Sequence, residues 1–211
     1  MVVMFEDRVD AARRLCLKLK KFKDSKNTIV VGLTRGGVVT AKVISDVLGL
    51  ELKALVVKKI GAPGNPELAI GALASTKDVY WNEGLLKELK IADWEKQYLV
   101  LQKAKEIRQL GKELKLKITP FEYKDKNVII VDDGVATGAT VVAAAKYLKR
   151  NKAVKITLAT PVISSDVLRD ISKYFDRLIF LQSVADFYAV GEFYRSFKQI
   201  SNEEVAKLLT T

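Results

Sequence analysis

Hydrophobic and polar residues follow each other along this chain in blocks whose spacing predicts helices and strands in turn. Residues 5–22 carry apolar side chains at helical spacing among charged ones, which is typical of an amphipathic helix. Short apolar runs rich in β-branched residues predict buried strands at 28–33, 52–57, 127–131, 155–159 and 177–181. Helical patterns follow three of these strands, at 38–48, 139–149 and 165–174. This alternation predicts an α/β fold with a parallel sheet.

The strand–helix alternation stops after the second predicted strand. Lys58 and Lys59 follow that strand directly, and a Gly- and Pro-rich stretch at 61–66 predicts a turn or loop. Two short apolar runs come next, at 70–73 and 79–81, and we interpret them as strands of a hairpin.

A long helix is predicted at 83–116, and one apolar stripe runs along it. The stripe consists of Trp94, Tyr98, Leu101, Ile107, Leu110 and Leu114. We expect this stripe to pack on the sheet or on another subunit. Because neither a linker nor an internal repeat divides the sequence, we interpret 1–211 as a single domain with a helical insert at 75–126.

The composition excludes several kinds of chemistry. The 211 residues include no histidine and one cysteine, so neither a Ser-His-Asp triad nor a His-ligated metal site is available. We expect Cys16 to be a buried apolar thiol, and its solitary state fits a reducing cytosol. No apolar run approaches the roughly 18 residues of a membrane span, and 1–5 is too short for a signal-peptide core. We therefore expect a soluble, cytoplasmic protein without a membrane partner.

The net charge leaves two interpretations open. Lys and Arg number 36 and Asp and Glu 25, for a charge of +11. Such a charge is typical of nucleic-acid binding, and also of a protein whose ligand is heavily phosphorylated. Basic residues exceed acidic ones at 103–126, where nucleic-acid binding would have to start. No aromatic residues alternate with these lysines as in a base-stacking platform, so nucleic-acid binding is only weakly supported, and composition alone does not decide between the two interpretations.

The motif with the clearest chemistry lies at 128–140. An apolar strand ends in Asp132 and Asp133, and a turn rich in Gly and Thr then opens a helix. Free N–H groups at 137–140, with the hydroxyls of two threonines, can bind a phosphate at the positive end of that helix. The two carboxylates can accept hydrogen bonds from vicinal hydroxyls of a sugar or from a water on Mg²⁺. The Lys of a Walker A loop and the third Gly of a dinucleotide fingerprint are both missing.

These residues resemble a known family. Segment 128–140 is similar to the signature of type I phosphoribosyltransferases that binds 5-phosphoribosyl diphosphate (PRPP). A wider resemblance, to a group of uncharacterised phosphoribosyltransferases, includes the turn at 35–37 and the segments 58–61, 67–72 and 187–194. It implies a Rossmann-like parallel sheet flanked by helices, with a small hood formed by 183–200.

The resemblance also implies a role for each part of the site. It places the 5′-phosphate of PRPP on Gly134, Ala136, Thr137, Gly138, Ala139 and Thr140. Asp132 and Asp133 would bind the ribose hydroxyls, and with Arg35 they are the expected catalytic residues. The pyrophosphate-binding residues would be Thr34, Arg35, Gly36, Gly37, Lys58 and Lys59, with a non-proline cis peptide at Thr34–Arg35. For the two lysines a plain surface pair is an equal alternative.

The acceptor side of the expected site is less defined by the sequence. Phe187 and Tyr188 lie where the family places hood residues that stack on a base, although an aromatic core under the hood is the alternative. Glu67 is a candidate contact to metal or acceptor, or else a solvated loop acid. The insert at 75–126 departs from purine-salvage and orotate enzymes of the family, so a standard nucleobase is not implied.

The resulting hypothesis is a transferase of nucleotide metabolism, a glycosyltransferase that uses PRPP and Mg²⁺. It would move the phosphoribosyl group to an unidentified nitrogenous, nucleobase-like acceptor and release pyrophosphate. No direct metal ligand is assigned, and Asp132 and Asp133 would reach the ion through water. We expect a homodimer. The alternative is a non-catalytic regulator that binds PRPP or a nucleotide and contacts nucleic acid through its basic surface.

Overall fold

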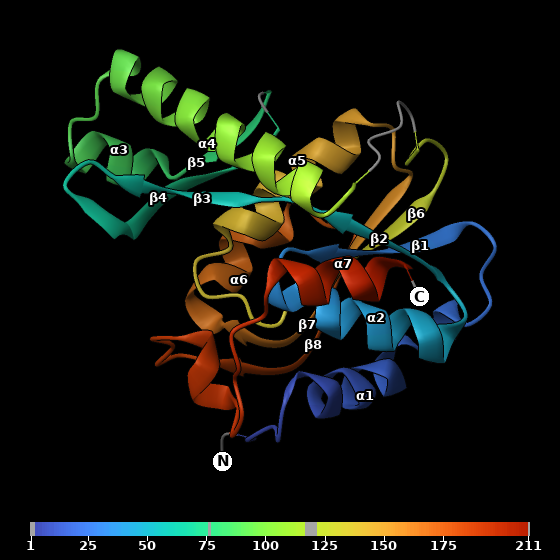
Figure 1. Ribbon diagram of the computed structural model, residues 1–211. Coiled ribbons are helices and arrows are strands. Elements are labelled where there is room, and N and C mark those ends of the chain that lie inside the picture. Colours follow the sequence, from blue (N-terminus) through green and yellow to red (C-terminus); the bar gives the residue numbers. More distant parts are fainter. Residues whose placement is uncertain (1–2, 76, 117–121, 211) are drawn as a thin grey trace.

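The computed structural model describes residues 3–75, 77–116 and 122–210 and contains a parallel sheet of five strands. The strands are β2 (Glu51–Leu55), β1 (Thr28–Leu33), β6 (Asn127–Val131), β7 (Lys155–Ser164) and β8 (Arg177–Val184), in that spatial order. All neighbours are parallel. The predicted α/β fold with a parallel sheet is confirmed (Figure 1).

Helices cover both faces of the sheet, and the side chains of each strand alternate between the two. On one face, β1 and β6 pack against α1 (Arg8–Leu19) and α2 (Gly36–Leu48); this core includes Cys16, which is buried as expected. On the other face they pack against α5 (Ala139–Arg150) and α6 (Ser165–Ser172). Figure 1 shows α1 and α2 below the sheet and α5 above it. Because both faces are covered, every residue of β1 is buried.

A second, antiparallel sheet of three strands is formed by β3 (Lys58–Ala62), β4 (Asn65–Ser75) and β5 (Asp78–Trp81). The predicted hairpin of 70–73 and 79–81 is part of it. We expected Lys58 and Lys59 to follow the end of a strand and 61–66 to be a turn or loop. This expectation was wrong, because residues 58–66 belong to a further hairpin, formed by β3 and β4. Pro63 and Gly64 make its turn, with Gly64 at a φ of 74°, and this Pro-Gly pair suits a tight type II turn.

Strand β2 also differs from its prediction. It ends at Leu55 and most of its residues are partly or fully exposed, whereas a buried strand at 52–57 was expected. The strand lies at the edge of the sheet, so one of its sides has no neighbouring strand. An apolar sequence pattern does not distinguish an edge strand from a central one.

The predicted long helix is two helices, α3 (Glu83–Glu88) and α4 (Asp93–Glu113). The predicted apolar stripe is only partly covered. Leu110 and Leu114 are buried, but Trp94, Tyr98 and Leu101 are 70%, 57% and 62% exposed. Helix α4 packs on the small sheet through a neighbouring stripe that includes Ala104, so the first half of the predicted stripe faces away from it.

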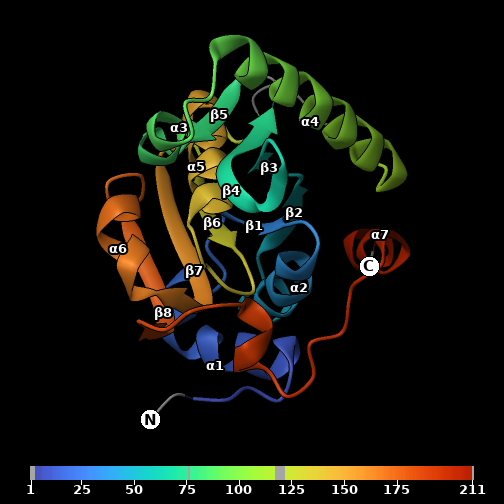
Figure 2. The same cartoon turned by 90° about the vertical axis from the view of Figure 1, so that its left-hand side faces the viewer.

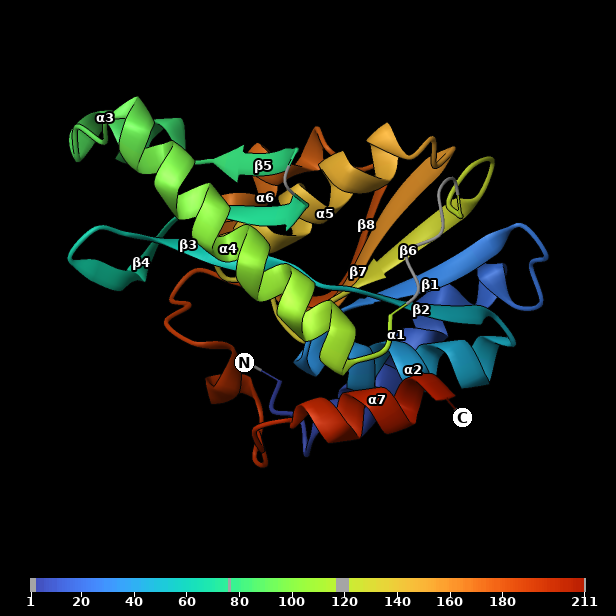
Figure 3. The same ribbon diagram turned by 45° about the horizontal axis from the view of Figure 1, so that its top comes forward.

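The sequence pattern missed the helix α7 (Asn202–Thr210). It packs against α2 and α4, and its Val205 is fully buried between them. Figures 2 and 3 show α7 beside α2, with α4 crossing above β3 and β4. Within the residues that the structure describes, no helix is both long and apolar enough to span a membrane.

The close packing of α2 on β1 can be tested at Gly32. A Cβ there would lie 2.7 Å from Cα of Val38 and 2.8 Å from Cβ of Ala41, and neither atom can yield without moving α2. We expect Gly32→Ala to lower the free energy of unfolding by about 1–3 kcal/mol in urea denaturation. Gly111→Ala is the matched control, because its Cβ meets nothing within 4 Å in helix α4. This control substitution should raise the free energy of unfolding by about 0.5–1 kcal/mol, because alanine favours a helix more than glycine does. Equal stabilities of the two variants would contradict the prediction.

Candidate active site

The order of the strands predicts a ligand crevice between β1 and β6. These two neighbours run parallel, but the chain leaves β1 through α2 toward β2 on one side and leaves β6 through α5 toward β7 on the other. At such a reversal the loops after the two strands separate, and ligands of open α/β sheets bind between them. The loops that follow β1 and β6 are 34–37 and 132–138, which contain most of the predicted site residues.

The loop after β1 lies directly against the loop after β6. A Cβ on Gly37 would lie 2.7 Å from the carbonyl oxygen of Val131, and one on Gly36 would overlap the carboxylate of Asp133. Only glycine permits this approach. The peptide Thr34–Arg35 is cis, as predicted. The buried hydroxyl of Thr34 has no hydrogen-bond partner among the described residues.

The loop after β6 leads into the amino-terminal end of α5. Gly138 is the N-cap with a φ of 73°, a conformation that favours glycine, and a Cβ there would lie 2.6 Å from Cγ2 of Ile171. The first N–H groups of a helix have no partner within it, so the start of α5 can donate to a phosphate. Thr137 is exposed beside them. The predicted phosphate residues therefore form one continuous turn at the crevice.

The two adjacent carboxylates have different surroundings. Asp132 is partly exposed and no ion pair involves it within the described ranges. Burial of its carboxyl group and the negative charge of Asp133 raise the pKa of Asp132 well above its usual range, and the charge of Lys59 opposes this shift. Asp133 is buried, and its Oδ2 accepts a hydrogen bond of 2.7 Å from Nε of Arg8 on α1. Of the two acids, Asp133 is the one that has an ion-pair partner among the described residues.

Two of the three predicted pyrophosphate cations share one cavity. Arg35 and Lys58 line a cavity of about 270 Å³ together with Glu106, Gln109, Leu110, Glu113 and Asn202 from α4 and α7. Lys58 Nζ lies 3.6 Å from Oε2 of Glu106. A larger cavity of about 900 Å³ between β2, α4, α5 and α7 contains none of the predicted site residues.

The predicted acceptor residues differ in their surroundings. Phe187 packs on Phe193 with ring centroids 4.8 Å apart, whereas Tyr188 is 83% exposed. Glu67 is exposed on β4 of the small sheet.

Sequence reasoning missed Arg8 and Glu106 as neighbours of the site. A signal existed for Arg8, since it shares helical spacing with Ala12, Leu15 and Leu19 and thus lies on the buried side of α1. Nothing in the local sequence distinguishes Glu106 from the other acids of α4.

Comparisons with known proteins identify the family of this chain. The family model of the phosphoribosyl transferase domain matches residues 4–195, so the chain belongs to this family. A Mycobacterium tuberculosis protein named "putative phosphoribosyl transferase" is 35% identical over 212 aligned residues, which cover 98% of this chain and 46% of the relative. The chain thus spans about half the length of that relative. The crystal structure of TT1426 from Thermus thermophilus is 30% identical, with a TM-score of 0.79 and 98% of both chains covered.

The raised pKa of Asp132 predicts a pH dependence of stability. An unfolded Asp has a pKa of about 3.9, so from about pH 4 upward the folded state binds more protons than the unfolded state. The contribution of Asp132 to stability therefore falls as pH rises toward its folded pKa. We expect Asp132→Asn to lose this part of the pH dependence and to have a higher free energy of unfolding than the wild type at pH 7, measured by urea denaturation across pH. A less stable variant at pH 7 would contradict the pKa direction.

Proposed function

We propose that the protein transfers the 5-phosphoribosyl group from PRPP to a nitrogenous acceptor and releases pyrophosphate. The observation that carries the proposal is the contact of the two Gly-containing loops across the crevice between β1 and β6. One loop opens a helix and suits a phosphate, and the other exposes Arg35 and contains the buried, unpartnered hydroxyl of Thr34. PRPP has a phosphate at one end of its ribose and a diphosphate at the other, which matches this pair of loops.

Each part of PRPP has a partner in this arrangement. The turn 134–140 binds the 5′-phosphate, and Asp132 accepts hydrogen bonds from the ribose hydroxyls. The loop 34–37 donates to the diphosphate, and Arg35 and Lys58 neutralise part of its charge. In the reaction the bond from C1 to the diphosphate oxygen breaks and its electron pair leaves with the diphosphate. The nitrogen lone pair of the acceptor forms the new bond to C1, and the acceptor proton passes to water.

The charges of the site fit this reaction. Positive charge grows on the ribose ring and negative charge on the departing diphosphate in the transition state. In this proposal the carboxylate of Asp132 stabilises the ring, and the N–H groups of the loop 34–37 and Arg35 stabilise the diphosphate. None of these roles requires histidine.

The residues also fit a magnesium ion that enters with the ligand. The described residues contain no group of three or more acidic or sulfur side chains that could hold a metal. Mg²⁺ is commonly bound by one or two carboxylates together with substrate phosphates and water, and Asp132 supplies such a carboxylate. Bound there, the ion would neutralise charge on the diphosphate.

The acceptor is of the nucleobase type in this proposal, and its side of the site is the segment 183–200 with Phe187 and Tyr188. The exposed ring of Tyr188 is free to stack on a planar base. A homodimer and a cytoplasmic location are part of the same proposal. The regulator that binds PRPP without turnover, with or without nucleic acid, is the competing function.

Pyrophosphate release from PRPP and Mg²⁺ with a panel of bases tests the proposal. We expect release with one class of acceptor, and a loss of about 100-fold in kcat/KM for Arg35→Ala, because the diphosphate loses a charged donor. Arg177→Ala is the matched control: Arg177 is also exposed but begins β8, at the opposite end of the strands. It should keep wild-type rates.

A second measurement separates the enzyme from the regulator. PRPP at 100 times its Kd should stabilise either protein by about 2.7 kcal/mol. Thermal protection without turnover of any acceptor would favour the regulator. If PRPP gives no protection, both functions are refuted.

A further inference from the structure

We propose that the cavity of about 900 Å³ between β2, α4, α5 and α7 is a second ligand site, and that its ligand is an organic anion with an aliphatic body. The site goes beyond the proposed transfer reaction, because it shares no residue with the proposed PRPP site. Its size, its apolar walls and its charges each support this assignment.

The cavity lies where the main sheet ends. Among the described residues no further strand pairs with the outer side of β2, and the residues 52–56 at this edge line the cavity one after another. Helix α7 contacts both β2 and α4 beside this edge (Figure 3). Pockets for small molecules have volumes of about 300–1,000 Å³, so the cavity is large enough for an organic ligand.

Aliphatic side chains are the most frequent kind in the lining of the cavity. Leu55, Val56, Ala104 and Leu114 are buried members of this lining and come from β2, α4 and the residues that follow them. Burial of an alkyl chain against such walls is favourable, because it removes apolar surface of the ligand from water. The walls therefore suit a ligand whose body is a hydrocarbon chain.

Positive charge predominates among the polar residues of the lining. One acidic residue, Glu122, and six basic residues line the cavity, and the basic ones are Lys53, Lys77, Arg108, Lys115, Arg150 and Lys207. Lys53 and Arg150 form ion pairs with Glu51 and Asp78. The other lining cations include Lys77, Arg108 and Lys115, which are exposed and have no ion pair with a described residue. These three charges suit the negatively charged head of a ligand.

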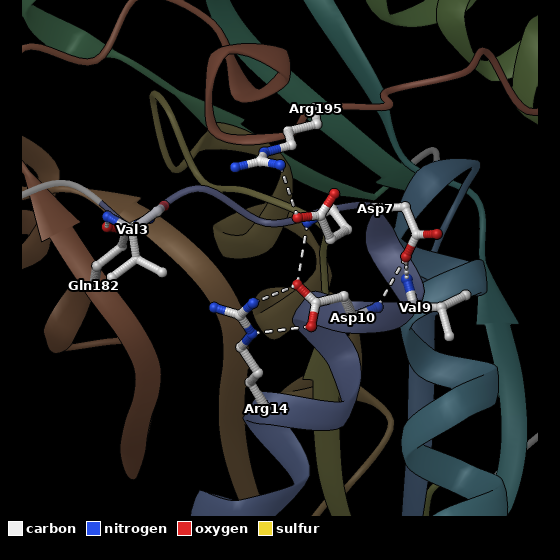
Figure 4. A network of polar contacts seen from close by, with 8 residues as sticks. Val3, Asp7, Val9, Asp10, Arg14, Gln182 and Arg195 are labelled. Atoms are coloured by element: carbon white, nitrogen blue, oxygen red, sulfur yellow. Dashed lines mark hydrogen bonds and ion pairs between the residues drawn. The ribbon is translucent and has the colours of Figure 1, made fainter.

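The surroundings of Arg108 differ from those of two exposed arginines near the amino terminus. Figure 4 shows Arg14, whose Nη2 lies 2.8 Å from Oδ2 of Asp10 one turn earlier in α1. Arg195 lies 3.2 Å from a carboxylate oxygen of Glu6. The positions three and four residues from Arg108 on either side hold Ala, Lys, Gly and Lys, so its own helix offers no acid within reach.

Helix α4 separates this cavity from the smaller one that Arg35 and Lys58 line. Ala104 and Arg108 line the large cavity, whereas Glu106, between them in sequence, lines the small one. Two residues along an α-helix correspond to about 200° around its axis, so the two cavities lie on opposite sides of α4. The anion site is thus distinct from the cations proposed to bind diphosphate.

Alkyl carboxylates are probes for this site, and isothermal titration calorimetry of the whole chain measures their Kd. We expect both decanoate and dodecanoate to bind. Dodecanoate should bind about tenfold more tightly than decanoate, because two more CH₂ groups leave water. Decanol has the chain of decanoate without its charge, so it should bind more weakly than decanoate.

A side chain at Gly111 tests whether the ligand occupies this cavity. Gly111 lines the cavity, and a Cβ there meets nothing within 4 Å, so a larger side chain enters the cavity without a clash at its first atom. We expect Gly111→Phe to weaken decanoate binding at least tenfold while keeping the melting temperature of the wild type. Gly111→Ala is the matched control and should bind decanoate within about twofold of the wild type.

A second pair of variants tests the charge. Arg108→Gln removes a cation of the lining, and we expect the Kd of decanoate to rise between about twofold and fivefold, as for an exposed ion pair. The Kd of decanol should not change. Arg14→Gln is the control, because Arg14 is an exposed arginine on α1, on the other face of the sheet. This pair keeps the test decisive even if Gly111→Phe does not fold.

Several results would overturn the assignment. The cavity is not an anion site if decanoate does not bind the wild type, or if decanol binds as tightly and Arg108→Gln has no effect. Equal binding by folded Gly111→Phe and Gly111→Ala would place the ligand elsewhere. The exposed stripe of Trp94, Tyr98 and Leu101 is the competing apolar surface. If Trp94→Ala weakens binding and Gly111→Phe does not, the ligand lies on that stripe and the proposal is wrong.

Discussion

Most of this structure depends on one constraint, the burial of β1 and β6 side by side in the centre of a parallel sheet. Helices cover both faces of these strands. Because the strands are parallel, the chain turns back after each of them and crosses one face of the sheet as a helix before the next strand begins. Because the two returning helices lead to opposite sides of the sheet, the loops after β1 and β6 face each other. The crevice is a consequence of topology, and the two loops contribute the chemistry.

The contact between these loops explains the glycines and the division between the acids. Side chains at Gly36 or Gly37 would occupy space that Asp133 and the backbone of β6 already fill. Asp133 is drawn into this packed region and paired with Arg8, while the pKa of Asp132 is raised because its carboxyl group is buried beside the negative charge of Asp133. Residues adjacent in sequence thus differ in environment because only one of them meets a cation from α1.

The elements next to the crevice were predictable because their signals are local. The strands at 28–33 and 127–131 and the turn that opens α5 have apolar runs and Gly-rich ends that act over a few residues. The small sheet, the exposed part of the α4 stripe and helix α7 were not predicted well. Their structure depends on which neighbour covers each face, and Trp94 and Leu110 look alike in a pattern although only the second is covered.

The sequence by itself determined the α/β class, the phosphate turn and the position of the paired acids, because strand burial and tight turns follow from the order of neighbouring residues. Only the tertiary structure decided which acid has an ion-pair partner: Arg8 from α1, 125 positions away along the chain, binds Asp133. It also placed Glu106 against Lys58. Such pairings form where distant segments meet, and their energy depends on burial and distance, which no local pattern of residue types contains.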